Sequence, residues 1–87
     1  MSEYRITFIR SARKELANLD KSTVSRILSK VESLAQQPHP RGSRKLEGAN
    51  DLWRIRVGDY RVIYRILDQE IVIEIVGVRH RRDAYRP

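Results

Sequence analysis

The stretch Leu52–Tyr64, LWRIRVGDYRVIY, places two alternating runs of apolar and charged residues on either side of Gly58-Asp59. Alternation with a period of two is typical of a β-strand with one buried face, and two residues between such runs predict a tight hairpin. A two-residue turn fixes the register of the hairpin, because it sets Arg56 opposite Arg61. This register divides the side chains between the two faces of a sheet.

One face of the predicted hairpin is apolar and forms the expected core, and the other is basic. The core face consists of Trp53, Ile55, Val57, Tyr60, Val62, Tyr64 and Ile66, and the charged residues on the other face are Arg54, Arg56, Arg61 and Arg65. Like charges that face each other across a hairpin repel, whereas the planar guanidinium group matches phosphate oxygens. The basic face is therefore either a solvated surface or a phosphate cradle made by Arg54, Arg56 and Arg61, with Glu74 of the next strand near Arg65.

The remaining segments predict an α+β fold. Apolar residues at helical spacing indicate one helix from about residue 11 to 19 and a second that is capped by Asp20 or Ser22 and ends at Pro38. A strand over residues 4–9 precedes the helices, and a loop over 37–44, strands over 52–57, 60–67 and 71–78, and a turn at 68–70 follow. We expect a single domain over residues 1–87, in which an antiparallel pair of helices covers one face of a mostly antiparallel sheet and leaves the basic face open.

The composition excludes several classes of protein. A chain of 87 residues forms one modest core and has no room for a large buried cofactor pocket. It has no cysteine, so disulfides, thiolate nucleophiles and cysteine-based zinc sites are excluded, and neither a metal site nor a cofactor is expected. No apolar run reaches the length of a signal peptide core or a membrane span, which predicts a cytoplasmic protein that does not enter the membrane. The formal net charge of +7 favours a polyanionic partner.

The C-terminal tail adds further basic residues and two groups that can move protons. Residues 79–87 contain four arginines, together with His80 and Tyr85. Taken separately, a histidine here is more often a surface residue and a near-terminal tyrosine a packing anchor. Neighbouring arginines stabilise the phenolate form of a tyrosine and so lower its pKa, which makes Tyr85 a candidate general base.

Four segments together resemble the RelE family of toxins from bacterial and archaeal toxin–antitoxin modules. They are Lys45–Gly48, Leu52–Val57, Gly58–Tyr64 and Val78–Tyr85. The resemblance implies a metal-independent endoribonuclease that enters the ribosomal A site, where it lies against 16S rRNA and cuts mRNA through attack of the RNA 2′-hydroxyl on the adjacent phosphorus. It also implies translation inhibition, and neutralisation by a cognate antitoxin that wraps the toxin.

The same resemblance implies roles for individual residues. Arg54, Arg56 and Arg61 match the strand positions that hold the scissile phosphate, and Arg81 and Tyr85 match the functional pair in the tail. Many family members have lysine at the first two of these positions, and an arginine is a poor proton shuttle because it stays protonated. Proton transfer is therefore expected to fall to Tyr85 and His80. Tyr85 would stack on a base or take the proton of the 2′-hydroxyl, and Arg81 or His80 would assist the leaving 5′-oxygen.

Two alternatives remain open. ParE-like toxins share the fold superfamily but poison DNA gyrase and are not nucleases, and their tails also contain basic runs ending in aspartate, as Arg81-Arg82-Asp83 does here. The third possibility is a module without enzymatic activity whose basic face only binds an acidic antitoxin.

Overall fold

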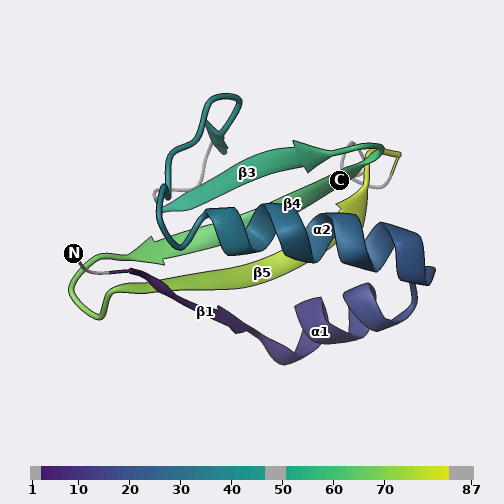
Figure 1. Cartoon of the computed structure of the whole chain (residues 1–87), viewed down its shortest axis with the longest axis horizontal. Helices are drawn as coiled ribbons and strands as arrows, with labels where there is room; N and C mark the ends of the chain where they lie inside the picture. The colour runs from purple at the N-terminus through teal and green to yellow at the C-terminus, as the bar shows by residue number, and fades with distance from the viewer. Residues whose placement is uncertain (1–2, 47–50, 83–87) are drawn as a thin grey trace.

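Five strands form one sheet with the spatial order β1-β5-β4-β3-β2, and both helices lie against the same face of it (Figure 1). The computed structural model describes residues 3–46 and 51–82. In chain order the elements are β1 (Arg5–Phe8), α1 (Arg10–Ala17), α2 (Lys21–Ser33), β2 (Arg44–Lys45), β3 (Leu52–Val57), β4 (Tyr60–Leu67) and β5 (Val72–His80). β1 is parallel to β5 and the other strand pairs are antiparallel. The expected α+β fold with a mostly antiparallel sheet is confirmed.

The hairpin of β3 and β4 has the register that its sequence predicts. Val57 pairs with Tyr60 and Arg56 with Arg61, and Gly58 at the turn has a φ of 60°. A side chain at Gly58 would be strained at this φ, and its Cβ would lie 2.8 Å from a guanidinium nitrogen of Arg26, which reaches the turn from α2. The backbone conformation of the turn therefore favours glycine, and a side chain there would also displace the flexible end of Arg26.

The core lies between the helices and the sheet. Its buried members on the sheet are Ile55, Val62, Tyr64, Ile73, Ile75 and Val78, and those from the helices and the turn after α2 are Ala12, Ile27, Val31 and Leu34. The other residues predicted for the core face of the hairpin, Trp53, Val57, Tyr60 and Ile66, are partly buried and pack against this cluster. Burial of these branched side chains against the sheet is the main favourable contribution to folding. None of the helices described is long and apolar enough to cross a membrane.

Three local features differ from the predicted elements. The second helix ends at Ser33 rather than near Pro38, because the chain tightens into a turn there and the carbonyl of Ala35 accepts the N–H of Tyr4, at 2.8 Å, where β1 approaches.

The second difference is the turn after β4, which includes Ile71. The φ of this residue, 56°, is unusual for a branched residue. Its N–H donates to the carbonyl of Asp68, so the third long strand begins one residue later than predicted and continues to His80.

The third difference is β2, which occupies part of the segment predicted to be a loop. Arg44 and Lys45 pair with Arg54 and Trp53, and Leu46 extends the pairing with a 2.9 Å hydrogen bond from its N–H to the carbonyl of Leu52. A two-residue strand has no periodicity that a sequence pattern could show. This short edge strand adds one more arginine to the basic face.

Of the two capping candidates in the sequence, Asp20 and Ser22, it is Asp20 that caps α2. Its carboxylate accepts hydrogen bonds from the hydroxyl of Ser22 at 2.6 Å, and from the hydroxyl and N–H of Thr23 at 2.6 and 3.3 Å. These bonds, first the one from Ser22 and then those from Thr23, lower the pKa of Asp20 to about 2. They satisfy an N–H in the first turn that has no partner within the helix.

Because the folded-state pKa of Asp20 is depressed, its stabilising contribution is complete above the unfolded pKa and is lost as the pH falls from about 4 towards 2. Asp20→Ala should lower the melting temperature at neutral pH, since it removes the cap. Asp20→Asn keeps a capping acceptor but does not titrate. Its melting temperature should therefore be close to that of the wild type at neutral pH and should fall less on acidification. Thermal unfolding followed by circular dichroism tests both, and equal acid sensitivity of Asp20→Asn and wild type would contradict the role of the carboxylate.

Candidate functional site

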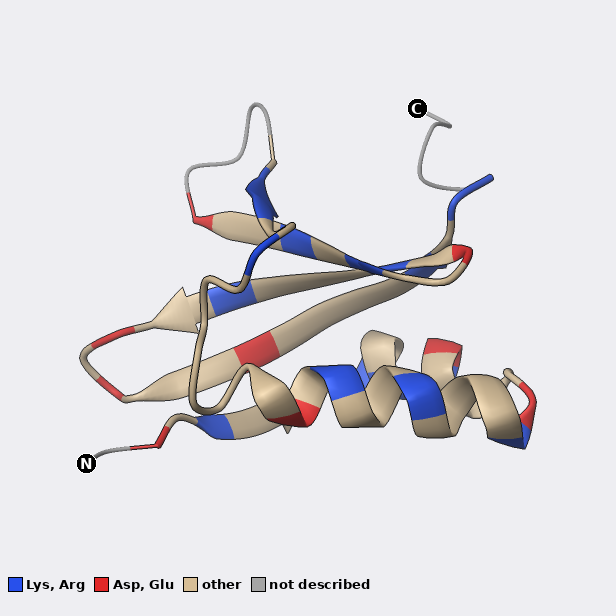
Figure 2. Ribbon diagram, turned by 45° about the horizontal axis from the view of Figure 1, so that its top comes forward, with Lys and Arg blue, Asp and Glu red and all other residues tan. Residues whose placement is uncertain are grey.

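The face of the sheet away from the helices bears arginines that strand pairing aligns in two rows. Figure 2 shows the basic residues on β2, β3 and β4 above the layer of helices. The first row consists of Arg56 on β3, Arg61 on β4 and Arg79 on β5. The second row consists of Arg44 on β2 and Arg54 on β3, and continues as Ile63 and Gly77 on β4 and β5. Directly paired residues lie on the same face of a sheet, so these side chains share one surface.

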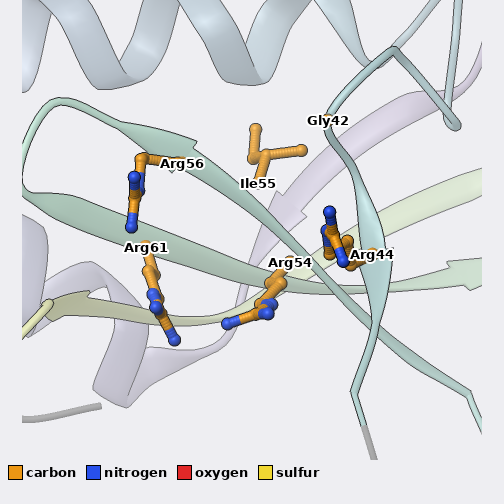
Figure 3. Close-up of a pocket in the computed structure, with 6 residues that line it drawn as sticks. All are labelled: Gly42, Arg44, Arg54, Ile55, Arg56 and Arg61. Carbon is orange, nitrogen blue, oxygen red and sulfur yellow. The ribbon is translucent and has the colours of Figure 1, made fainter. Parts of the chain in front are cut away.

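A surface hollow brings most of these arginines together. It is lined by Gly42, Arg44, Arg54, Ile55, Arg56 and Arg61. In Figure 3 the side chains of Arg54 and Arg61 point towards one another, and Arg44 stands farther along beside Gly42. Among the residues that the structure describes, none that lines the hollow is acidic. The hollow therefore offers an anion several guanidinium donors, each of which stays protonated at any physiological pH.

Two other arginines of this face are held by carboxylates. Arg65 forms ion pairs with Glu74 at 3.1 Å, as predicted, and with Asp51 at 3.0 Å. Arg79 pairs with Glu15 of α1 at 2.9 Å, and the second oxygen of the same carboxylate accepts the N–H of Val78 at 2.9 Å. Arg65 is thus neutralised outside the hollow, and Arg79 is fixed at the end of the first row.

The predicted tail residues lie apart from the hollow. His80 pairs with Tyr60 on β4, one position beyond the pair of Arg79 and Arg61, so its side chain lies on the opposite face. There its ring meets that of Tyr60 edge to face at a centroid distance of 5.2 Å, and its Nδ1 accepts the N–H of Arg82 at 3.2 Å. His80 and Arg81 line a second hollow with Asp59 and Arg82.

The tail begins at the hairpin turn. The N–H of Arg81 donates to the carbonyl of Asp59 at 2.7 Å, which joins the end of β5 to the turn between β3 and β4. Of the six residues predicted for the site, the structure thus gathers Arg54, Arg56 and Arg61 in one hollow and places His80 and Arg81 in another. Tyr85 lies outside the described residues.

The sequence did not indicate two members of the rows. The sequence predicts Arg79 in the tail, and only the continuation of β5 to His80 aligns it with Arg61. It predicts Arg44 in a loop. Its loop is positioned from the core, because the buried Tyr64 hydroxyl donates to the carbonyl of Pro38 at 2.8 Å and the ring of His39 packs edge-on against Trp53 at 4.4 Å. Burial raises the pKa of the Tyr64 phenol, so it stays a neutral donor.

Comparisons with known proteins place these features among toxins. The model of the family described as the ParE toxin of the type II toxin–antitoxin system parDE matches residues 6–85. A RelE-like toxin protein of Escherichia coli is 33% identical over 94% of this chain and 90% of its own length. The RelE of the archaeal RelE–RelB complex from Pyrococcus horikoshii OT3 is 37% identical, with a TM-score of 0.79 over 91% of this chain and 96% of that one. A chain of the toxin–antitoxin complex RelBE2 from Mycobacterium tuberculosis is 26% identical, with a TM-score of 0.80 over 90% and 98%.

The first row also has a cost in stability that can be measured. Arg56 is exposed and faces Arg61 directly across the hairpin, and like charges in this position repel. Arg56→Gln should therefore raise the free energy of unfolding by about 0.2–1 kcal/mol at low ionic strength, and inorganic phosphate should stabilise the wild type more than the variant. Urea unfolding with and without phosphate measures both effects. A variant that is less stable than the wild type and equally sensitive to phosphate would show that Arg56 is not part of an anion site.

Proposed function

We propose that this chain, which belongs to the RelE/ParE superfamily of type II toxins, inhibits translation as an endoribonuclease that cuts mRNA on the ribosome. The observation that carries the proposal is the hollow in which Arg54, Arg56 and Arg61 face the same space, with no acidic residue among the described residues that line it. Arginines aligned against one another lower stability, and a phosphate group relieves that repulsion. A phosphodiester is the ligand that best explains the arrangement.

The arginines would act on charge and not on protons. In the proposed reaction the 2′-hydroxyl loses its proton to a base, its oxygen bonds to the adjacent phosphorus, and the bond from phosphorus to the 5′-oxygen breaks. The products are a 2′,3′-cyclic phosphate and a 5′-hydroxyl that has gained a proton. The pentacoordinate phosphorus of the transition state has more negative charge on its oxygens than the ground state, and Arg54, Arg56 and Arg61 would stabilise that charge. Fixed guanidinium donors suit this role because they need no reorganisation during the reaction.

Proton transfer falls to the tail in this proposal. Tyr85 would accept the proton of the 2′-hydroxyl or stack on a base, and Arg81 would stabilise charge on the leaving 5′-oxygen. His80, the alternative to Arg81, lies on the face of the sheet opposite the arginine rows, which makes it the weaker candidate. The hydrogen bond between Arg81 and Asp59 would keep the start of the tail beside the hairpin that holds the phosphate.

Two kinds of partner belong to the proposal. Solved relatives are RelE–RelB and RelBE2 toxin–antitoxin complexes, so the chain acts with a cognate antitoxin of its own. The ribosomal A site, with its 16S rRNA, and the mRNA are the proposed target, and a net charge of +7 favours docking on such a polyanion. As an alternative, the matching family model is described as the ParE toxin, which supports gyrase as a second candidate target.

Arg61→Ala should reduce mRNA cleavage by translating ribosomes about 100-fold or more, because it removes a guanidinium from the centre of the first row. Arg13→Ala is the matched control, since it removes the same charge from an exposed position on α1, and it should cut at the rate of the wild type. Primer extension on a translated message measures both. Intact mRNA together with inhibited gyrase supercoiling would establish the alternative, and the absence of both activities with retained antitoxin binding would leave only a binding module.

The nucleophile can be tested separately from the protein. A message with one 2′-deoxynucleotide on the 5′ side of the scissile phosphate should not be cut there, although cleavage at other sites continues. The ends of the cut wild-type message should be a 2′,3′-cyclic phosphate and a 5′-hydroxyl, as mass spectrometry of the fragments can show. Cleavage at the deoxy position, or fragments with a 5′-phosphate, would mean that water and not the 2′-hydroxyl attacks the phosphorus.

A further inference from the structure

We propose that Arg44 and Arg54 form a second phosphate subsite, which binds the phosphate next to the scissile one along a single strand of RNA. The inference rests on the proposed function, because it takes Arg54, Arg56 and Arg61 as the residues that hold the scissile phosphate. Arg54, which pairs with Arg44 across β2 and β3, would contact both phosphates. It adds a binding residue, Arg44, that comes from outside the hairpin and that no sequence pattern indicates.

The spacing of the rows supports two phosphates rather than one. Arg54 and Arg56 are two residues apart on β3 and lie on the same face, so their rows are about 6.7 Å apart at 3.3–3.4 Å per residue. In Figure 3 Arg54 and Arg61 point towards one another while Arg44 stands farther along the hollow, so a ligand that contacts both Arg61 and Arg44 must extend along it. A single strand of RNA, with one phosphate per nucleotide, is such a ligand. The RNA would then run roughly along β3.

The second row is charged at one end and neutral at the other. Arg44 and Arg54 occupy β2 and β3, whereas Ile63 on β4 and the buried Gly77 on β5 continue the row without charge. Between residues 3–46 and 51–82, no carboxylate forms an ion pair with either arginine. A phosphate is therefore favoured over β2 and β3.

Arg44 is also held in place from the core, as a binding residue should be. Its strand follows a loop fixed by the hydrogen bond from Tyr64 to Pro38 and by the contact of His39 with Trp53. Tyr64 lies on the core face and is fully buried, so it cannot touch a ligand on the other face. It is a positioning residue for Arg44 in this scheme.

The subsite can be measured with RNA ligands that differ by one phosphate. A 2′-O-methyl dinucleoside monophosphate and the corresponding trinucleoside diphosphate cannot be cut by 2′-hydroxyl attack, and fluorescence titration gives their affinities for the isolated toxin. Arg44→Gln should leave the affinity for the one-phosphate ligand unchanged and lower that for the two-phosphate ligand about tenfold. For the two-phosphate ligand, the slope of log affinity against log salt concentration should be about 0.7 less steep for Arg44→Gln than for the wild type.

Arg41→Gln is the matched control. It removes the same charge from the same loop, but Arg41 does not line the hollow, so both affinities should match those of the wild type. Tyr64→Phe should reproduce the selective loss of Arg44→Gln in weaker form. A general loss of fold would instead lower the affinities for both ligands equally, and circular dichroism detects such a loss independently.

The remaining outcomes separate this inference from the proposed function. The subsite is overturned if folded Arg44→Gln loses affinity equally for both ligands, or loses affinity for neither. This holds even if the wild-type toxin cuts mRNA. Wild-type toxin that binds neither ligand also overturns it. A selective loss in Arg44→Gln with a toxin that does not cut mRNA supports the subsite and rejects the nuclease, since the two assays are independent.

Discussion

The two-residue turn at Gly58-Asp59 is the constraint on which the rest of the structure depends. Because successive side chains of a strand alternate between faces, a shift of one residue in this hairpin would exchange its buried and exposed sets. The turn allows one register, which sends Ile55, Val62 and Tyr64 into the core and Arg54, Arg56 and Arg61 to the open face. The core and the candidate site are therefore consequences of the same pairing.

The open face is a compromise between stability and binding. Cross-strand arginine pairs weaken the sheet, and the loss is offset by a core that ten buried residues form on the other side. Carboxylates pair with other arginines of this face, as Glu74 and Asp51 do with Arg65 and Glu15 does with Arg79. The described residues that line the hollow include no acidic side chain, which suits a surface that binds an anion.

The sequence predicted the parts of the molecule that depend on periodicity and turn chemistry. The hairpin register and the presence of two helices follow from local patterns, and the pair of Glu74 with Arg65 follows from the pairing of adjacent strands. For the cap of α2 the sequence offers Asp20 or Ser22, and the structure has Asp20. β2 could not be predicted, because two residues have no period, and the end of β5 could not, because the pairing with β4 shifts register between Ile63 and Tyr64. Arg44 and Arg79 join the rows through these long-range pairings, which no local sequence pattern indicates.

The packing of Arg26 against Gly58 has a consequence for how this toxin can evolve. A mutation that adds a side chain at position 58 meets an unfavourable backbone angle and must displace the flexible end of Arg26, so substitutions there weaken the turn that sets the hairpin register. Exchanges between arginine and lysine at positions 54 and 56 leave the hairpin pairing as it is. Descendants of this sequence are thus free to vary the chemistry of their charges while they inherit the spacing between them.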